Sequence, residues 1–106
     1  ISSELSFVTA FSGNLDVGDL RRIFDNIISN VKKYAEPSEP VELTISKRDE
    51  GIVIRQINRI AKDKQPSESY KMGLYSIRRI AQNYGGTVEV RDENGKYEIM
   101  ITLSNI

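Results

Sequence analysis

Three polar residues, Asn26, Asn30 and Lys33, recur at helical spacing. Successive helical residues turn by about 100°, so these side chains fall within an arc of roughly 60°. An Asn carbonyl can ligate a hard cation, and Lys supplies a positive charge for phosphate. Ile23 and Tyr34 border the stripe, so the amides stand at the edge of an apolar face, where a cleft can open. The spacing alone therefore predicts either a solvated helix flank or a site for a cation and a phosphate.

The residue types that are missing narrow the chemistry further. The 106 residues contain no Cys and no His, which excludes disulfides, thiolate sites and the usual general base. Lys plus Arg and Asp plus Glu are both 15, so no overall basic field indicates nucleic acid. With 39% hydrophobic residues and no uncharged stretch approaching a bilayer span, we expect one soluble domain over residues 1–106.

Two segments have the apolar periodicity of amphipathic helices. The first is expected to run from an acidic N-cap, Asp16 or Asp19, to about residue 36, because Pro37 disfavours a helical conformation at the residue before it. The second is expected over residues 74–84. It ends at Gly85-Gly86, which can supply the positive φ of a helix C-terminus.

Other segments alternate apolar and polar residues, as half-buried strands do. They are residues 5–11, 41–45, 52–54, 88–91 and 97–103. The second and third are expected to form one hairpin and the last two another. Residues 59–69 are polar and basic, and we interpret them as a loop. The pattern predicts an α+β fold, a two-layer sandwich whose helices cover one face of a mixed sheet of about five strands.

The amino-acid sequence of the first expected helix resembles a known motif. Residues 20–34 read LRRIFDNIISNVKKY, which is similar to the N-box of the ATP-binding domain of bacterial sensor histidine kinases, in the Bergerat or GHKL family. The resemblance implies that Asn30 ligates Mg²⁺. It also implies that Asn26 binds nucleotide and acts in catalysis, and that Lys33 and Tyr34 contact the nucleotide.

A second stretch extends the resemblance. Residues 72–86, MGLYSIRRIAQNYGG, look like the second glycine box of the same family and the helix that follows it. The resemblance places Met72, Gly73 and Leu74 at the nucleotide. Lys71, just before them, is a candidate for phosphate binding through its charge, and a solvated basic loop is the alternative. The likeness covers roughly residues 5–104 and implies a Bergerat-type sandwich that binds ATP and Mg²⁺.

The chain departs from the family pattern at both glycine boxes. The first box is normally an Asp followed by Gly-x-Gly, and here residues 56–61 read QINRIA, with Asn58 in place of the Asp. An Asn carbonyl can still accept a hydrogen bond from an adenine amino group. In the second box, residues 69–73 read SYKMG, which keeps only Gly73 before a Leu. Glycine-rich loops cradle phosphate with converging N–H groups, so we expect phosphate binding to be weakened or reshaped.

Three functions remain compatible with these observations. The first is the catalytic, ATP-binding domain of a sensor histidine kinase, which transfers the ATP γ-phosphoryl group to a His on a separate dimerisation domain. The resemblance then implies that the chain is a cytoplasmic fragment of a homodimeric parent in the bacterial cell membrane, with a response regulator as indirect partner and no nucleic acid. The second is a degenerate regulatory module of the same fold with weak or no nucleotide binding. The third is a ferredoxin-like RNA-binding domain, although the strand over residues 52–58 lacks aromatic residues for base stacking.

Overall fold

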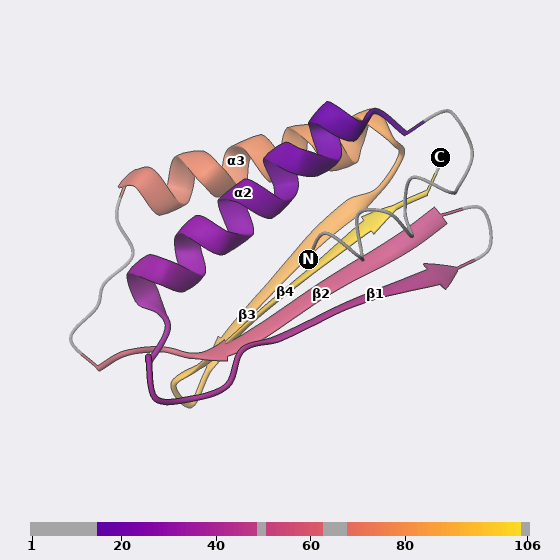
Figure 1. Cartoon of the computed structure of the whole chain (residues 1–106). Helices are drawn as coiled ribbons and strands as arrows, with labels where there is room; N and C mark the ends of the chain where they lie inside the picture. Colours follow the sequence, from indigo (N-terminus) through magenta and orange to yellow (C-terminus); the bar gives the residue numbers. More distant parts are fainter. Residues whose placement is uncertain (1–14, 49–50, 63–67, 105–106) are drawn as a thin grey trace.

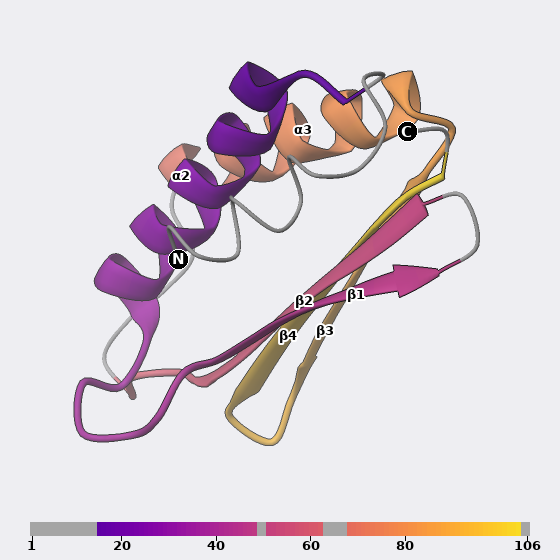
Figure 2. The ribbon, with the colours of Figure 1, turned by 45° about the vertical axis from the view of Figure 1, so that its right-hand side comes forward.

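The structure, a computed structural model, describes residues 15–48, 51–62 and 68–104. The elements follow in the order α2 (Val17–Tyr34), β1 (Glu42–Arg48), β2 (Gly51–Arg59), α3 (Glu68–Asn83), β3 (Thr87–Glu93) and β4 (Lys96–Leu103). Both helices lie on the same face of one sheet (Figure 1). Figure 2 shows the helix layer and the sheet from another side. The expected two-layer α+β sandwich is confirmed.

The sheet differs from the expectation in strand number and direction. Its four described strands stand in the order β1-β2-β4-β3, and every neighbouring pair is antiparallel. The expected mixed character of the sheet is therefore wrong for the described strands, whereas the four strands expected within the described residues are all present. The crossover through α3 gives β2 and β3 the same direction, but β4 lies between them, so no parallel pair forms. The strand expected over residues 5–11 lies outside the described residues.

The two helices begin and end for identifiable reasons. At the start of α2, the Asp16 carboxylate accepts a hydrogen bond from the Gly18 N–H at 2.7 Å, which is an N-cap. At its end, Ala35 is already extended, close to the expected boundary. Helix α3 begins at Glu68, earlier than the expected residue 74. The loop expected over residues 59–69 is shorter in the structure, because Tyr70 packs against the core and extends the apolar face of α3 by one turn.

The core changes in polarity along the sheet. Register places the helix-facing residues in rows that cross the strands. The rows, taken toward the end of β2, are Val88–Ile101–Ile54–Ile45, then Val90–Ile99–Gln56–Leu43, then Asp92–Tyr97–Asn58. The first row is aliphatic and the last carries an amide, a phenol and a carboxylate. The core of the sandwich is therefore apolar in its middle and polar at one end.

The opposite ends of the two helices are tied together by Tyr84. Its hydroxyl donates to Asp19 Oδ2 at 2.8 Å and accepts from the Asp16 N–H at 3.0 Å. Burial raises the pKa of Tyr84, so the hydroxyl stays protonated and can act as this donor.

Neither helix is both long enough and apolar enough to cross a lipid bilayer, within the described ranges.

Candidate functional site

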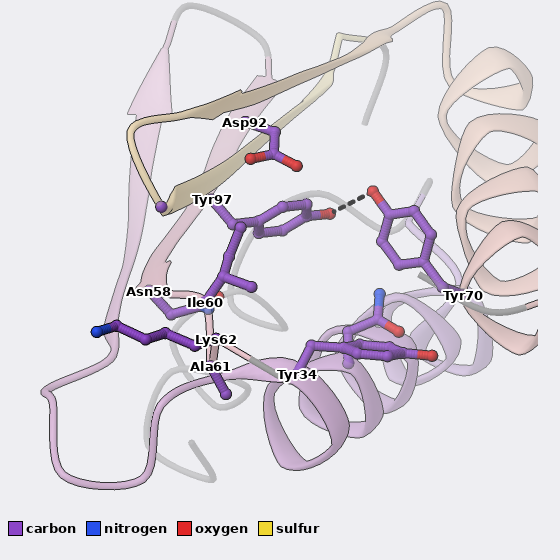
Figure 3. Close-up of a pocket in the computed structure, with 10 residues that line it drawn as sticks. Tyr34, Asn58, Ile60, Ala61, Lys62, Tyr70, Asp92 and Tyr97 are labelled. Atoms are coloured by element: carbon purple, nitrogen blue, oxygen red, sulfur yellow. Dashed lines mark hydrogen bonds between the residues drawn. The ribbon is translucent and has the colours of Figure 1, made fainter. Parts of the chain in front are cut away.

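A cavity of about 340 Å³ opens where the helix layer meets the polar end of the sheet. Its volume lies within the range of small-molecule sites, about 300–1,000 Å³. Figure 3 shows side chains from both layers converging on it. The lining residues are Asn30, Tyr34, Asn58, Ile60, Ala61, Lys62, Tyr70, Asp92, Gly95 and Tyr97.

The sheet supplies a polar floor to this cavity. Asp92, Tyr97 and Asn58 are register partners on β3, β4 and β2, so their side chains share one face and one row. Asn58 is 5% exposed and Tyr97 is 9% exposed. Asn58 Oδ1 accepts from Gln56 Nε2 at 2.6 Å, and Asn58 Nδ2 donates to the Arg59 carbonyl at 2.8 Å. The floor therefore presents an amide whose orientation is set by its own strand.

Three tyrosines form an aromatic wall. The Tyr34 and Tyr70 rings meet edge to face with centroids 6.1 Å apart, and Tyr70 and Tyr97 do the same at 6.0 Å. The Tyr70 hydroxyl donates to the Tyr97 hydroxyl at 3.2 Å, as the dashed line in Figure 3 shows. Burial raises the pKa of Tyr97, so its hydroxyl remains neutral. Such rings offer flat apolar surface to a planar ligand.

Main-chain hydrogen bonds fix the spacing between the α2 wall and the β2 wall. The segment after α2 forms a bridge between Ala35 and Ile60. The Glu36 N–H donates to the Arg59 carbonyl at 2.9 Å, and the Ala61 N–H donates to the Tyr34 carbonyl at 2.9 Å. We call these contacts the main-chain seam. It joins Tyr34 on one wall to residues 59–61 on the other without using a side chain.

Three of the residues predicted from the sequence come together here. Asn30 and Tyr34 lie on α2, Asn58 lies on β2, and all three line the cavity. Asn26 lies outside the lining. Its Nδ2 donates to the Arg22 carbonyl at 3.0 Å, and its Oδ1 faces α3. The stripe expected on the first helix is therefore divided between the cavity and the contact between helices.

The remaining predicted residues stand outside the cavity lining. Lys33, Lys71 and Met72 are exposed, and Leu74 is half-buried against the core. Gly73 is buried inside α3. The segment that resembles the second glycine box is thus helical, and the N–H groups beyond the first turn of a helix bond within the helix. It is not a loop of convergent N–H groups.

Several lining residues were not among the sequence-based candidates. They are Ile60, Ala61, Tyr70, Asp92, Gly95 and Tyr97. A partial signal existed for Tyr97, since it begins a run of alternating apolar residues directly after a turn. The sequence contains no such signal for Tyr70, because it directly follows the polar segment 59–69, which has no apolar period. Lys62 lines the cavity mouth, but its side chain extends away from the tyrosines in Figure 3.

A cation at Asn30 needs ligands from a bound compound. Across the part of the chain that the structure describes, no group of three or more acidic, His or Cys side chains could hold a metal ion. Mg²⁺ commonly keeps several waters and takes one or two protein ligands together with phosphate oxygens. A single amide oxygen at the cavity wall fits that pattern and does not fit a metal site made by protein alone.

Comparisons with known proteins agree with the resemblance seen in the sequence. Residues 15–105 match the family model described as histidine kinase-, DNA gyrase B-, and HSP90-like ATPase. The chain belongs to this ATPase family. The sensor histidine kinase YrkQ of Bacillus subtilis (strain 168) is 33% identical over 92 residues, which are 87% of this chain and 21% of that protein. The chain thus spans about a fifth of this curated relative.

A solved structure shows the same fold. The Acinetobacter baumannii histidine kinase AdeS superposes with a TM-score of 0.68 at 14% identity, over 84% of this chain and 47% of that one. The histidine kinase ATPase domain expected from the two boxes is confirmed as the family. Membership of the ATPase family accounts for residues 15–105, which the RNA-binding alternative does not. In this ATPase domain, the cavity between α2 and the sheet is the candidate nucleotide site.

Proposed function

We propose that this chain binds ATP with Mg²⁺ in the cavity and, within a longer sensor kinase, presents the γ-phosphoryl group to a His on a dimerisation domain. The observation that carries the proposal is the meeting of Asn30, Tyr34 and Asn58 around one cavity. The sequence picked these residues from two separate boxes. A polar floor and an aromatic wall there suit a planar base that carries polar edges.

The base end of the site is assigned to the floor. Asn58 Oδ1 accepts one hydrogen bond from Gln56 and, as a carbonyl oxygen, has capacity for a second. An adenine amino group is the matching donor. Ile60, Ala61 and Tyr34 supply the apolar surface that desolvates the ring.

The phosphate end is assigned to α2. Asn30 would hold Mg²⁺ through its amide oxygen, and the ion neutralises phosphate charge when it is bound. Lys33 and Lys71 are exposed cations that can reach phosphate from outside the cavity lining. Asn26 lies one helical turn from Asn30 and is proposed to act in catalysis from the same stripe. The role of these residues is to position the triphosphate.

The phosphoryl acceptor must lie on another domain or chain, because these 106 residues contain no His. Phosphoryl transfer depends largely on positioning and electrostatic stabilisation, so a domain that holds ATP can act on an acceptor presented to it. The relatives' names, sensor histidine kinase and histidine kinase, support a parent of this kind. We extend the proposal to a homodimeric parent anchored in the bacterial membrane, with this domain in the cytoplasm and a response regulator downstream.

A second candidate is a regulatory module of the same fold that does not catalyse. The helical conformation of residues 69–73, where the family pattern has a phosphate-binding glycine box, favours this alternative. It engages the N–H groups of residues 71–73 within the helix, while Asn30 and Asn58 remain at the cavity.

Calorimetric titration separates the two candidates. The domain is titrated with ATP and ADP, in Mg²⁺ and in chelator, beside Asn30→Ala and the matched exposed control Asn83→Ala. Micromolar binding that Mg²⁺ strengthens, and that Asn30→Ala weakens while Asn83→Ala does not, supports the kinase function. Phosphate transfer to a supplied His domain then tests catalysis. No binding at millimolar nucleotide would leave the regulatory module.

A further inference from the structure

Gln56 is a polar side chain in an apolar position. It is 1% exposed and lies on the helix-facing side of β2, in the row whose other members are Leu43, Ile99 and Val90. A buried amide is unfavourable unless it is hydrogen-bonded. Gln56 Nε2 donates to Asn58 Oδ1 at 2.6 Å, and both residues are buried. The partner of this buried amide is thus a residue of the nucleotide cavity.

The direction of the hydrogen bonds follows from a backbone group. The Arg59 carbonyl can only accept, so the Asn58 atom 2.8 Å from it must be Nδ2. Asn58 Oδ1 then faces Gln56, which must present its Nε2. Reversing either amide would place two acceptors or two donors against each other. The Arg59 carbonyl also accepts from the Glu36 N–H in the main-chain seam, so the chain of bonds is anchored at a fixed point.

We propose that Gln56 is a positioning residue for base recognition, which holds the Asn58 amide with its oxygen available to accept from the base. The inference rests on the proposed function, since it concerns how the same cavity chooses its nucleotide. An Asn can present either its oxygen or its NH₂ group, whereas an Asp in this place offers only acceptors. Gln56, which faces the Asn58 oxygen, and the Arg59 carbonyl, which faces its NH₂ group, together remove that ambiguity.

The chemical consequence is a choice between purines. Adenine carries an amino group at the position where guanine carries a carbonyl oxygen. When Asn58 presents its oxygen to the base, that oxygen accepts a hydrogen bond from the adenine amino group and is repelled by the guanine carbonyl oxygen. An Asn58 free to rotate can donate to guanine instead. Discrimination between ATP and GTP therefore depends in part on Gln56, which itself does not line the cavity.

The test uses Gln56→Met, which keeps the length of the side chain and removes both hydrogen-bonding groups. Ile99→Met, at the cross-strand partner of Gln56, is the matched core control. Affinities for Mg²⁺-ATP and Mg²⁺-GTP are measured by calorimetry, beside thermal unfolding of each variant. We expect wild type and Ile99→Met to prefer ATP, and the ATP-to-GTP affinity ratio to fall about fivefold to tenfold in Gln56→Met, the effect of one hydrogen bond.

Each outcome bears on a separate statement. An unchanged ratio in a folded Gln56→Met would overturn the role of Gln56 and leave the proposed function standing. No binding of either nucleotide by wild type would overturn both. Wild-type NMR tests the inference without any variant: the side-chain NH₂ groups of Gln56 and Asn58 are expected to be protected from hydrogen exchange, and rapid exchange of both would contradict it.

Discussion

Gly73 of α3 lies directly against Asn26 of α2, so that a Cβ atom at position 73 would stand 2.8 Å from Asn26 Oδ1. No ordinary Cβ contact is that short, so a larger residue at position 73 would require the Asn26 amide to move. The one glycine kept from the second box thus serves the packing of α3 on α2. The amide that it meets belongs to the stripe from which the nucleotide site was predicted.

The Gly73–Asn26 contact predicts an interaction between substitutions. In a helix interior Ala is more favourable than Gly by about 1 kcal/mol, but at Gly73 the added methyl must displace the Asn26 amide. We expect Gly73→Ala to change the free energy of unfolding little in wild type. It should stabilise an Asn26→Ala background by about 1 kcal/mol. Urea unfolding of the four proteins measures this difference, and equal effects in both backgrounds would show that the contact is not limiting.

Substitution of Asn30 tests the metal end of the cavity. Asn30 is half-buried at the wall, and Ala is the better helix former, so Asn30→Ala should not lower the free energy of unfolding. We expect the affinity for ATP in Mg²⁺ to fall by about tenfold or more, which is the loss of one charge-assisted contact. The affinity in chelator should stay the same. A parallel fall in chelator would show that Asn30 contacts the nucleotide and not the ion.

Asn58→Asp restores the residue type of the family pattern, yet the structure predicts a cost. A carboxylate cannot donate to the Arg59 carbonyl, so two oxygens would face each other where Nδ2 now lies 2.8 Å from that carbonyl. We expect a loss of about 1–3 kcal/mol in the free energy of unfolding at neutral pH. Denaturant unfolding measures it. Wild-type stability in this variant would mean that the Asn58 amide is not held as described.

The buried phenol Tyr97 predicts a loss of stability in alkali. Burial raises the pKa of Tyr97 above its ordinary value, near 10, so the folded protein keeps a proton that the unfolded chain releases. The stability that Tyr97 contributes through this pKa shift is fully present below a pH of about 10 and is lost as the pH rises further. Tyr97→Phe should flatten this loss of stability, leaving the smaller share due to Tyr84. Thermal unfolding between pH 8 and 11 compares the slopes, and parallel slopes would contradict the assignment.

The sequence predicted those parts of the site that depend on local spacing. Asn30 and Tyr34 are four residues apart on one helix, and helical geometry alone places them side by side. Asn58 was found from its place in a family motif. Gln56 is also unusual in the sequence itself. It follows Ile52 and Ile54 at the two-residue period of a strand, where a buried apolar residue is expected.

The parts that depend on distant pairing could not be predicted in this way. The row Asp92–Tyr97–Asn58 exists because β4 pairs with β2, and a shift of one residue would turn every side chain to the other face. That register is a property of the whole sandwich. The start of α3 was misjudged for the same reason, since Tyr70 is ordered by contacts with Tyr34 and Tyr97 from other elements.

The main-chain seam has a consequence for how this domain can evolve. Its hydrogen bonds join peptide groups of residues 34–36 to those of residues 59–61, so side chains there can be exchanged without changing the distance between the two walls. Selection can then alter the chemistry of the cavity while its width is inherited unchanged. A fold shared with AdeS at 14% identity is what such an arrangement allows. The seam needs the peptide groups of residues 59–61 but not glycine at these positions, which here are Arg, Ile and Ala.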